Sequence, residues 1–194
     1  MAGTSTRVER LTNAINVIVG FVREVQTLRA LRDAGVPAQT FWRVLNNSTF
    51  DMAVINWCKL FGSDDQAHQP THWKNIAPDE QKFRNELLAA IGVSWSEWVS
   101  YRYEVKHYRD NSAAHHSVER KHIKTFPRYD LALKAALHYY AAAVHQIRVE
   151  CGVPYEHPTL DQYMADFYEQ ALRSAQLATN ATRSWAETVD FSIV

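Results

Sequence analysis

Apolar residues recur at steps of three and four along most of the chain, the spacing that places them on one face of an α-helix. We therefore predict a first helix over about 5–34, which Gly35 and Pro37 end. A second helix is expected over about 37–61, with poor helix formers at 46–48 that favour a kink. The apolar stripe of the first helix consists of Val8, Leu11, Ile15, Ile18, Val22, Val25 and Leu28.

Capping signals divide the rest of the chain into further helices. A polar loop over 63–77 precedes a helix over about 78–90. Ser94, with Glu97 three residues later, forms a capping box that begins the next helix, which should reach at least Tyr108. The remaining elements are a loop over about 117–126, a helix between Pro127 and Gly152, and a last helix from about Leu160.

No segment alternates with the period of two that marks a half-buried strand. The predicted fold class is therefore all-α, a single-domain bundle of five to six helices over 1–180. Beyond it we expect a C-terminal tail over 181–194 that is weakly ordered or docked through Phe191 and Ile193.

The composition excludes several classes of protein. The 194 residues are 46% hydrophobic and carry 21 basic and 21 acidic side chains, so the chain is long enough for one core and is not globally basic. Two cysteines, Cys58 and Cys151, exclude a disulfide framework and a four-cysteine zinc site. We see neither a secretory signal nor a run of about 18 apolar residues, and we expect a cytoplasmic protein with no membrane partner.

The neutral total hides an uneven distribution of charge. Seven basic and three acidic residues fall between Arg102 and Arg128, whereas seven acidic and two basic residues follow from Glu150 onward. Such runs are commonly solvated faces. The functional interpretation of the basic stretch is a site for an anion such as phosphate, which arginine binds through its planar fork.

The basic stretch contains Arg109 followed by His115 and His116. Spacing alone carries little weight, because roughly two pairs of Arg and His at this spacing are expected by chance in a chain with 14 Arg and 9 His. The order of the surrounding segments is more specific. These segments are 56–63, 72–74, 83–84, 87–88, 104–110, 114–115, 129–133 and 139–140.

This order resembles the HEPN superfamily, most closely its abortive-infection branch, over about residues 8–150. The resemblance implies an all-helical bundle and a metal-independent ribonuclease without a cofactor, acting in a bacterial defence or toxin system. It assigns the catalytic positions to Arg109, Asp110 and His115, with His116 as the alternative histidine. It also implies a homodimer that brings two motifs across one cleft, with RNA as substrate and an antitoxin protein as a possible partner.

The chemistry can also be written from the side chains. A histidine with an ordinary pKa of about 6.5 can act as base or acid at neutral pH, and Arg109 can stabilise charge on phosphorus. On a straight α-helix Arg109 would share a face with His116 rather than with His115. A break in the helix at 111–112 would instead allow His115 to approach Arg109. Predicted substrate contacts are Asn111, Lys106, Arg102, Arg120 and Lys121.

Two other functions remain open. The same residues suit a helical module that binds RNA or a protein partner without turnover, in which Arg109 is merely ion-paired. A metal-binding bundle is the third possibility, because His138 and His145 are seven residues apart and would share a helical face.

Overall fold

The protein is a bundle of helices, and the described residues contain no strand. The structure is a computed structural model that describes residues 2–62, 69–113, 127–156 and 159–184. The α-helices are α1 (Ala2–Asp33), α2 (Thr40–Phe61), α3 (Trp73–Ile76), α4 (Glu80–Ile91), α5 (Trp95–Tyr108), α6 (Tyr129–His145) and α7 (Leu160–Thr182). Two π-helical segments, η1 (Arg109–Ala113) and η3 (Gln146–Glu150), continue α5 and α6.

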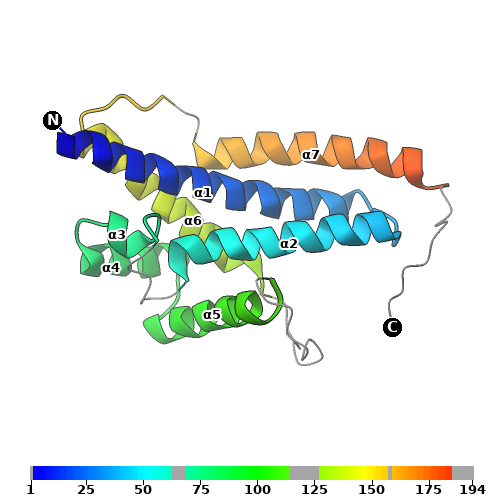
Figure 1. Cartoon of the computed structure of the whole chain (residues 1–194), viewed down its shortest axis with the longest axis horizontal. Coiled ribbons are helices and arrows are strands. Elements are labelled where there is room, and N and C mark those ends of the chain that lie inside the picture. The colour runs from blue at the N-terminus through cyan, green and yellow to red at the C-terminus, as the bar shows by residue number, and fades with distance from the viewer. Residues whose placement is uncertain (1, 63–68, 114–126, 157–158, 185–194) are drawn as a thin grey trace.

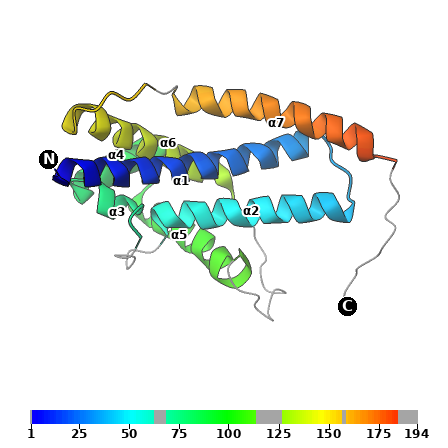
Figure 2. The ribbon, with the colours of Figure 1, turned by 45° about the horizontal axis from the view of Figure 1, so that its top comes forward.

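The long helix α1 organises the bundle. It packs against α2, α7 and α6, and Figure 1 shows α1, α2 and α7 side by side along the long axis of the molecule. The shorter helices α3, α4 and α5 gather with α6 around the end that contains the N-terminus. Turning the molecule, as in Figure 2, keeps α7 beside α1 and α5 beneath α2.

The apolar stripe predicted for the first helix forms the core. Leu11, Ile18 and Val22 are fully buried, and they meet a cluster of large aromatic side chains from α2 and the shorter helices. That aromatic cluster contains Trp57, Phe61, Trp73, Phe83, Trp98 and Tyr139, whose ring centroids are 5.2–5.7 Å apart. A second, small cluster of Leu31, Trp42 and Ala175 joins α1, α2 and α7 at the opposite end.

The predicted all-α class is confirmed, and so is the capping box, in which Ser94 and Glu97 each accept from the other's backbone N–H. Three details differ. The second helix is continuous through 46–48, and α7 extends through Thr182, so the first two residues of the predicted tail belong to a helix. The predicted loop over 63–77 contains α3. Among the described residues, none of the helices is long and apolar enough to cross a bilayer.

Candidate functional site

The site predicted around Arg109 lies where α5 passes into η1. Trp98, Arg102, Val105 and Tyr108 form the buried face of α5, so the last turn of the helix is fixed against the core. From Arg109 the backbone widens into the π-helical segment η1, which packs against α2. Such π turns are rare and frequently mark functional positions, because they change the direction in which successive side chains point.

Two consecutive residues of α2 hold both flanks of segment 114–126. The Tyr108 hydroxyl, just before the segment, donates to Oδ1 of Asp51 at 2.8 Å. The Tyr129 hydroxyl, just after it, donates to the carbonyl of Phe50 at 3.0 Å. The Phe50 ring contacts both tyrosine rings, each at a centroid distance of 5.1 Å. Described residues on either side of segment 114–126 are therefore held at one point on α2.

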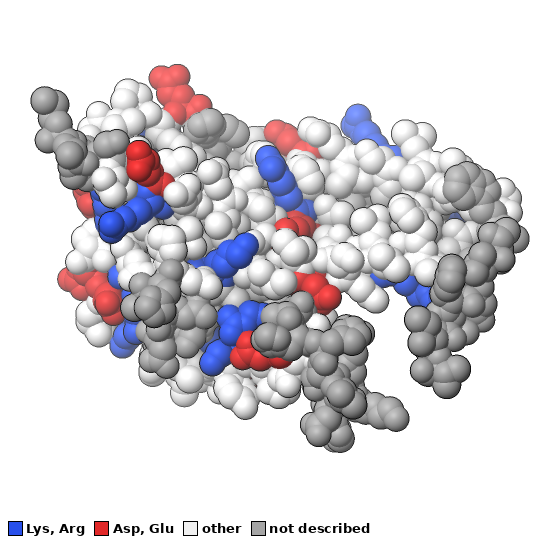
Figure 3. All heavy atoms as spheres, viewed as in Figure 1, with Lys and Arg blue, Asp and Glu red and all other residues white. Residues whose placement is uncertain are grey.

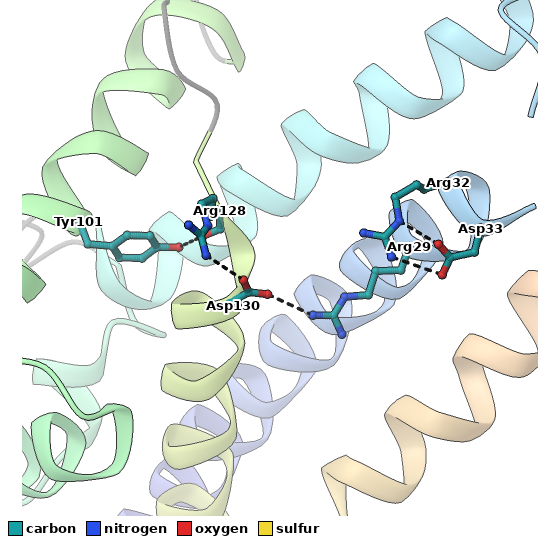
Figure 4. A network of polar contacts seen from close by, with 6 residues as sticks. All are labelled: Arg29, Arg32, Asp33, Tyr101, Arg128 and Asp130. Atoms are coloured by element: carbon teal, nitrogen blue, oxygen red, sulfur yellow. Dashed lines mark hydrogen bonds and ion pairs between the residues drawn. The ribbon is translucent and has the colours of Figure 1, made fainter. Parts of the chain in front are cut away.

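Further polar contacts fix the start of α6, as Figure 4 shows. The Tyr101 hydroxyl of α5 donates to the carbonyl of Arg128 at 2.6 Å. Asp130 lies between the guanidinium groups of Arg128 and Arg29, at 3.5 and 3.6 Å. Because these ion pairs are largely exposed, they contribute less to stability than to the direction in which α6 begins. The Arg32–Asp33 pair in the same view lies farther along α1.

Arg109 is oriented by its neighbour. Its Nε donates to Oδ1 of Asp110 at 2.7 Å, and its Nη2 lies 2.6 Å from the same oxygen. The side chain of Arg109 is 17% exposed, and that of Asp110 is 43% exposed. A guanidinium has five N–H donors. Binding to one carboxylate oxygen does not use all of them, so others can bind an anion.

Cys58 of α2 lies beneath this guanidinium and hydrogen-bonds to it. Burial raises the pKa of the thiol to about 12, although the positive charge of Arg109 acts to lower it. The thiol is therefore protonated at neutral pH and is a packing group rather than a nucleophile. Nothing in the sequence connects Cys58 with Arg109, which lie 51 positions apart.

Three other predicted contact residues have distinct surroundings. Asn111 is half-buried and donates from Nδ2 to the carbonyl of His107 at 2.8 Å, which satisfies a carbonyl at the end of α5. Lys106 is half-buried on the last turn of the same helix. Arg102 is 6% exposed and donates to the carbonyls of Phe61 and Gly62, so its guanidinium is turned into the protein at the end of α2.

The histidines of the predicted motif lie outside the described residues, together with the other two predicted contacts. These residues are His115, His116, Arg120 and Lys121. The range that contains Arg109 ends at Ala113, two residues before His115 in the sequence. The α-helical spacing that favoured His116 does not apply across η1, because its turns are π-helical.

Charges of both signs lie on the face of the molecule seen in Figure 1. Figure 3 shows Lys and Arg interspersed with Asp and Glu over the face seen in Figure 1, without a broad area of one sign among the residues it colours. A hollow of about 500 Å³ beside the start of α6 has the same mixture, with Arg128 and Lys134 facing Glu104 and Asp130.

The two histidines of the metal hypothesis line a separate hollow of about 600 Å³ between α4 and α6. Burial lowers the pKa of His138, whose ring lies 5.1 Å from that of Phe83, whereas Glu86 acts to raise it. His145 is exposed. Within the described ranges, no three His, Cys, Asp or Glu residues are grouped as a metal ion would require.

Comparisons with protein-family models, with curated proteins and with solved structures find no match for this chain.

Proposed function

We propose that the protein is a metal-independent endoribonuclease of a bacterial defence or toxin system, acting as a homodimer. In this proposal Arg109 binds the scissile phosphate and stabilises the charge that develops on it, and Asp110 holds the guanidinium in place. His115, with His116 as the alternative, moves the proton of the ribose 2′-hydroxyl.

The observation that supports this proposal is the anchoring of both flanks of segment 114–126 beside Arg109. Tyr108 and Tyr129 meet Phe50 and Asp51 on α2, so described residues on both sides of the segment are held together, and Tyr108 directly precedes an oriented, partly exposed guanidinium. Metal-free cleavage of RNA requires a cation for the charge that develops on phosphorus, which Arg109 can supply, together with groups that move protons.

One motif supplies a single histidine, whereas cleavage needs a base for the 2′-hydroxyl and an acid for the leaving 5′-oxygen. A symmetric dimer would provide a second histidine at the same cleft, which is why the proposal includes a homodimer. Sedimentation at increasing protein concentration tests this part. A monomer at all concentrations that support cleavage would contradict it.

The cleavage assay uses end-labelled RNA with excess EDTA. We expect fragments that end in a 2′,3′-cyclic phosphate, the product of attack by the 2′-hydroxyl. His115→Ala and His116→Ala, compared under the same conditions, assign the histidine, since only one should abolish cleavage. Intact RNA after long incubation, or fragments only after a metal ion is added, would refute the proposal.

A second function, a non-catalytic binding module, is favoured by one observation on α5. Trp95, Val99 and Tyr103 repeat every four residues and are 37%, 42% and 68% exposed, which makes an apolar stripe on the outer side of the helix. RNA that is retained by the protein but not cleaved in the same assay would favour this module over the enzyme.

A further inference from the structure

The outer face of α2 carries an apolar stripe of its own. Phe41, Val44 and Met52 are 66%, 58% and 44% exposed and lie at helical spacing on one side of α2. We call these three residues the α2 stripe. Arg43 is also exposed, and its Nη2 donates to the Thr40 hydroxyl at 3.2 Å, one turn before Val44. Single exposed apolar side chains are ordinary, but a row of three along one helix is a surface that favours an occupant.

The end of α7 is fastened to the start of this stripe. Gln39 donates from Nε2 to the carbonyl of Thr182 at 3.3 Å, and the indole N–H of Trp42 donates to the Thr182 hydroxyl at 3.3 Å. The Phe41 ring packs edge-on against Trp42, with 5.2 Å between the centroids. The Trp42 side chain therefore contacts both Thr182 and Phe41, the first residue of the α2 stripe.

Segment 185–194 follows directly from this attachment point. An extended chain advances at most about 3.6 Å per residue, so Trp185 lies within about 11 Å of Thr182. The α2 stripe is about 17 Å long at the 1.5 Å rise of a helix, whereas ten residues can extend about 33–36 Å. The segment can therefore cover the whole stripe from its point of attachment.

The composition of the segment matches the surface. Besides Ala186 it carries five larger apolar side chains and two acids, Glu187 and Asp190, and it has no Lys or Arg. Arg43 supplies the opposite charge. The larger apolar side chains are Trp185, Val189, Phe191, Ile193 and Val194.

We propose that residues 185–194 dock on the α2 stripe of their own chain, with their apolar side chains over Phe41 and Val44 and an acidic side chain at Arg43. The docked segment buries the stripe beside the small cluster of Leu31, Trp42 and Ala175. The proposal uses neither Arg109 nor Asp110, so it does not depend on ribonuclease activity.

Disulfide trapping tests this docking in the full chain. Val44→Cys with Val189→Cys, in a Cys151→Ser background that leaves only buried Cys58, should form an intramolecular disulfide under mild oxidation. Val99→Cys with Val189→Cys is the matched control, because Val99 is also an exposed valine but lies on α5. Equal trapping in both pairs, disulfides only between two chains, or no trapping would overturn the proposal.

Charge reversal tests the role of Arg43. Arg43→Glu should slow trapping of the Val44–Val189 pair by roughly two- to fivefold, the range for an exposed ion pair. Adding Glu187→Lys and Asp190→Lys should restore the rate. A rate that is unchanged by Arg43→Glu would overturn the assignment of Arg43 to the docked acidic side chain.

Discussion

Replacing Arg102 by methionine should strongly destabilise the fold. The Arg102 side chain is 6% exposed, and its Nε and Nη2 donate to the carbonyls of Phe61 and Gly62 at 2.7 and 2.9 Å. These carbonyls belong to the end of α2, where the helix itself provides no donors. Methionine fills much of the alkyl volume but cannot donate, so the variant removes both hydrogen bonds and keeps most of the packing.

The magnitude follows from the type of bond. A hydrogen bond from a charged donor contributes about 1.5–3 kcal/mol, and a buried carbonyl left without its donor costs a comparable amount. Partial relaxation reduces the sum of two such losses, so we expect the free energy of unfolding to fall by about 3 kcal/mol. With a urea slope of about 2–3 kcal/mol per molar, the midpoint should fall by roughly 1–1.5 M.

Urea denaturation followed by tryptophan fluorescence measures this change. Arg128→Met is the matched control, because the Arg128 side chain is 87% exposed and its ion pair with Asp130 is at the surface. It should cost less than about 1 kcal/mol. If Arg102→Met unfolded within about 0.5 kcal/mol of the native protein and instead weakened RNA binding, the structural role of Arg102 would be refuted.

Three further substitutions or treatments test other parts of the structure. Gly92→Ala, at a position where φ is +72°, should lower the free energy of unfolding by about 1 kcal/mol, seen as a Tm lower by a few degrees. Cys58, whose pKa burial raises to about 12, should resist iodoacetamide at pH 8 far longer than half-buried Cys151, and mass spectrometry in urea should show the difference disappear. Burial raises the pKa of Glu24, although its hydrogen bond from Asn56 acts to lower it. The folded state therefore binds this proton more tightly than the unfolded state, and the free energy of unfolding falls as pH rises above about 4.5. Glu24→Gln should therefore gain stability relative to the native protein between pH 4 and 7, whereas a difference independent of pH would contradict this assignment.

The helices could be predicted because their signals are local. The 3.6-residue spacing of apolar positions and the Ser94–Glu97 capping box act within a few residues, and both are confirmed. The short helix α3 was missed because it depends on distant contacts. Its Trp73 stacks on Phe83 at 5.2 Å, and four helical residues have no periodicity to detect.

The candidate site was predictable only in part. Arg109 and Asp110 stand in a recognisable motif, but the anchoring residues are 57 and 79 positions from their partners, so no local pattern reveals them. The sequence position of Arg102 indicates burial, whereas its charge favours the predicted substrate contact. It lies four residues after Trp98 and three before Val105, which places it on the buried face of α5.

Cleavage by an Arg109→Ala variant tests the central claim most directly. The rate at which the cyclic-phosphate product forms should fall by at least about 100-fold, as for the loss of one group that stabilises a transition state. Circular dichroism would check that the variant remains helical, and Arg173→Ala, in an exposed ion pair on α7, should cleave at the native rate. A folded Arg109→Ala protein that cleaves RNA as fast as the native chain would contradict the account.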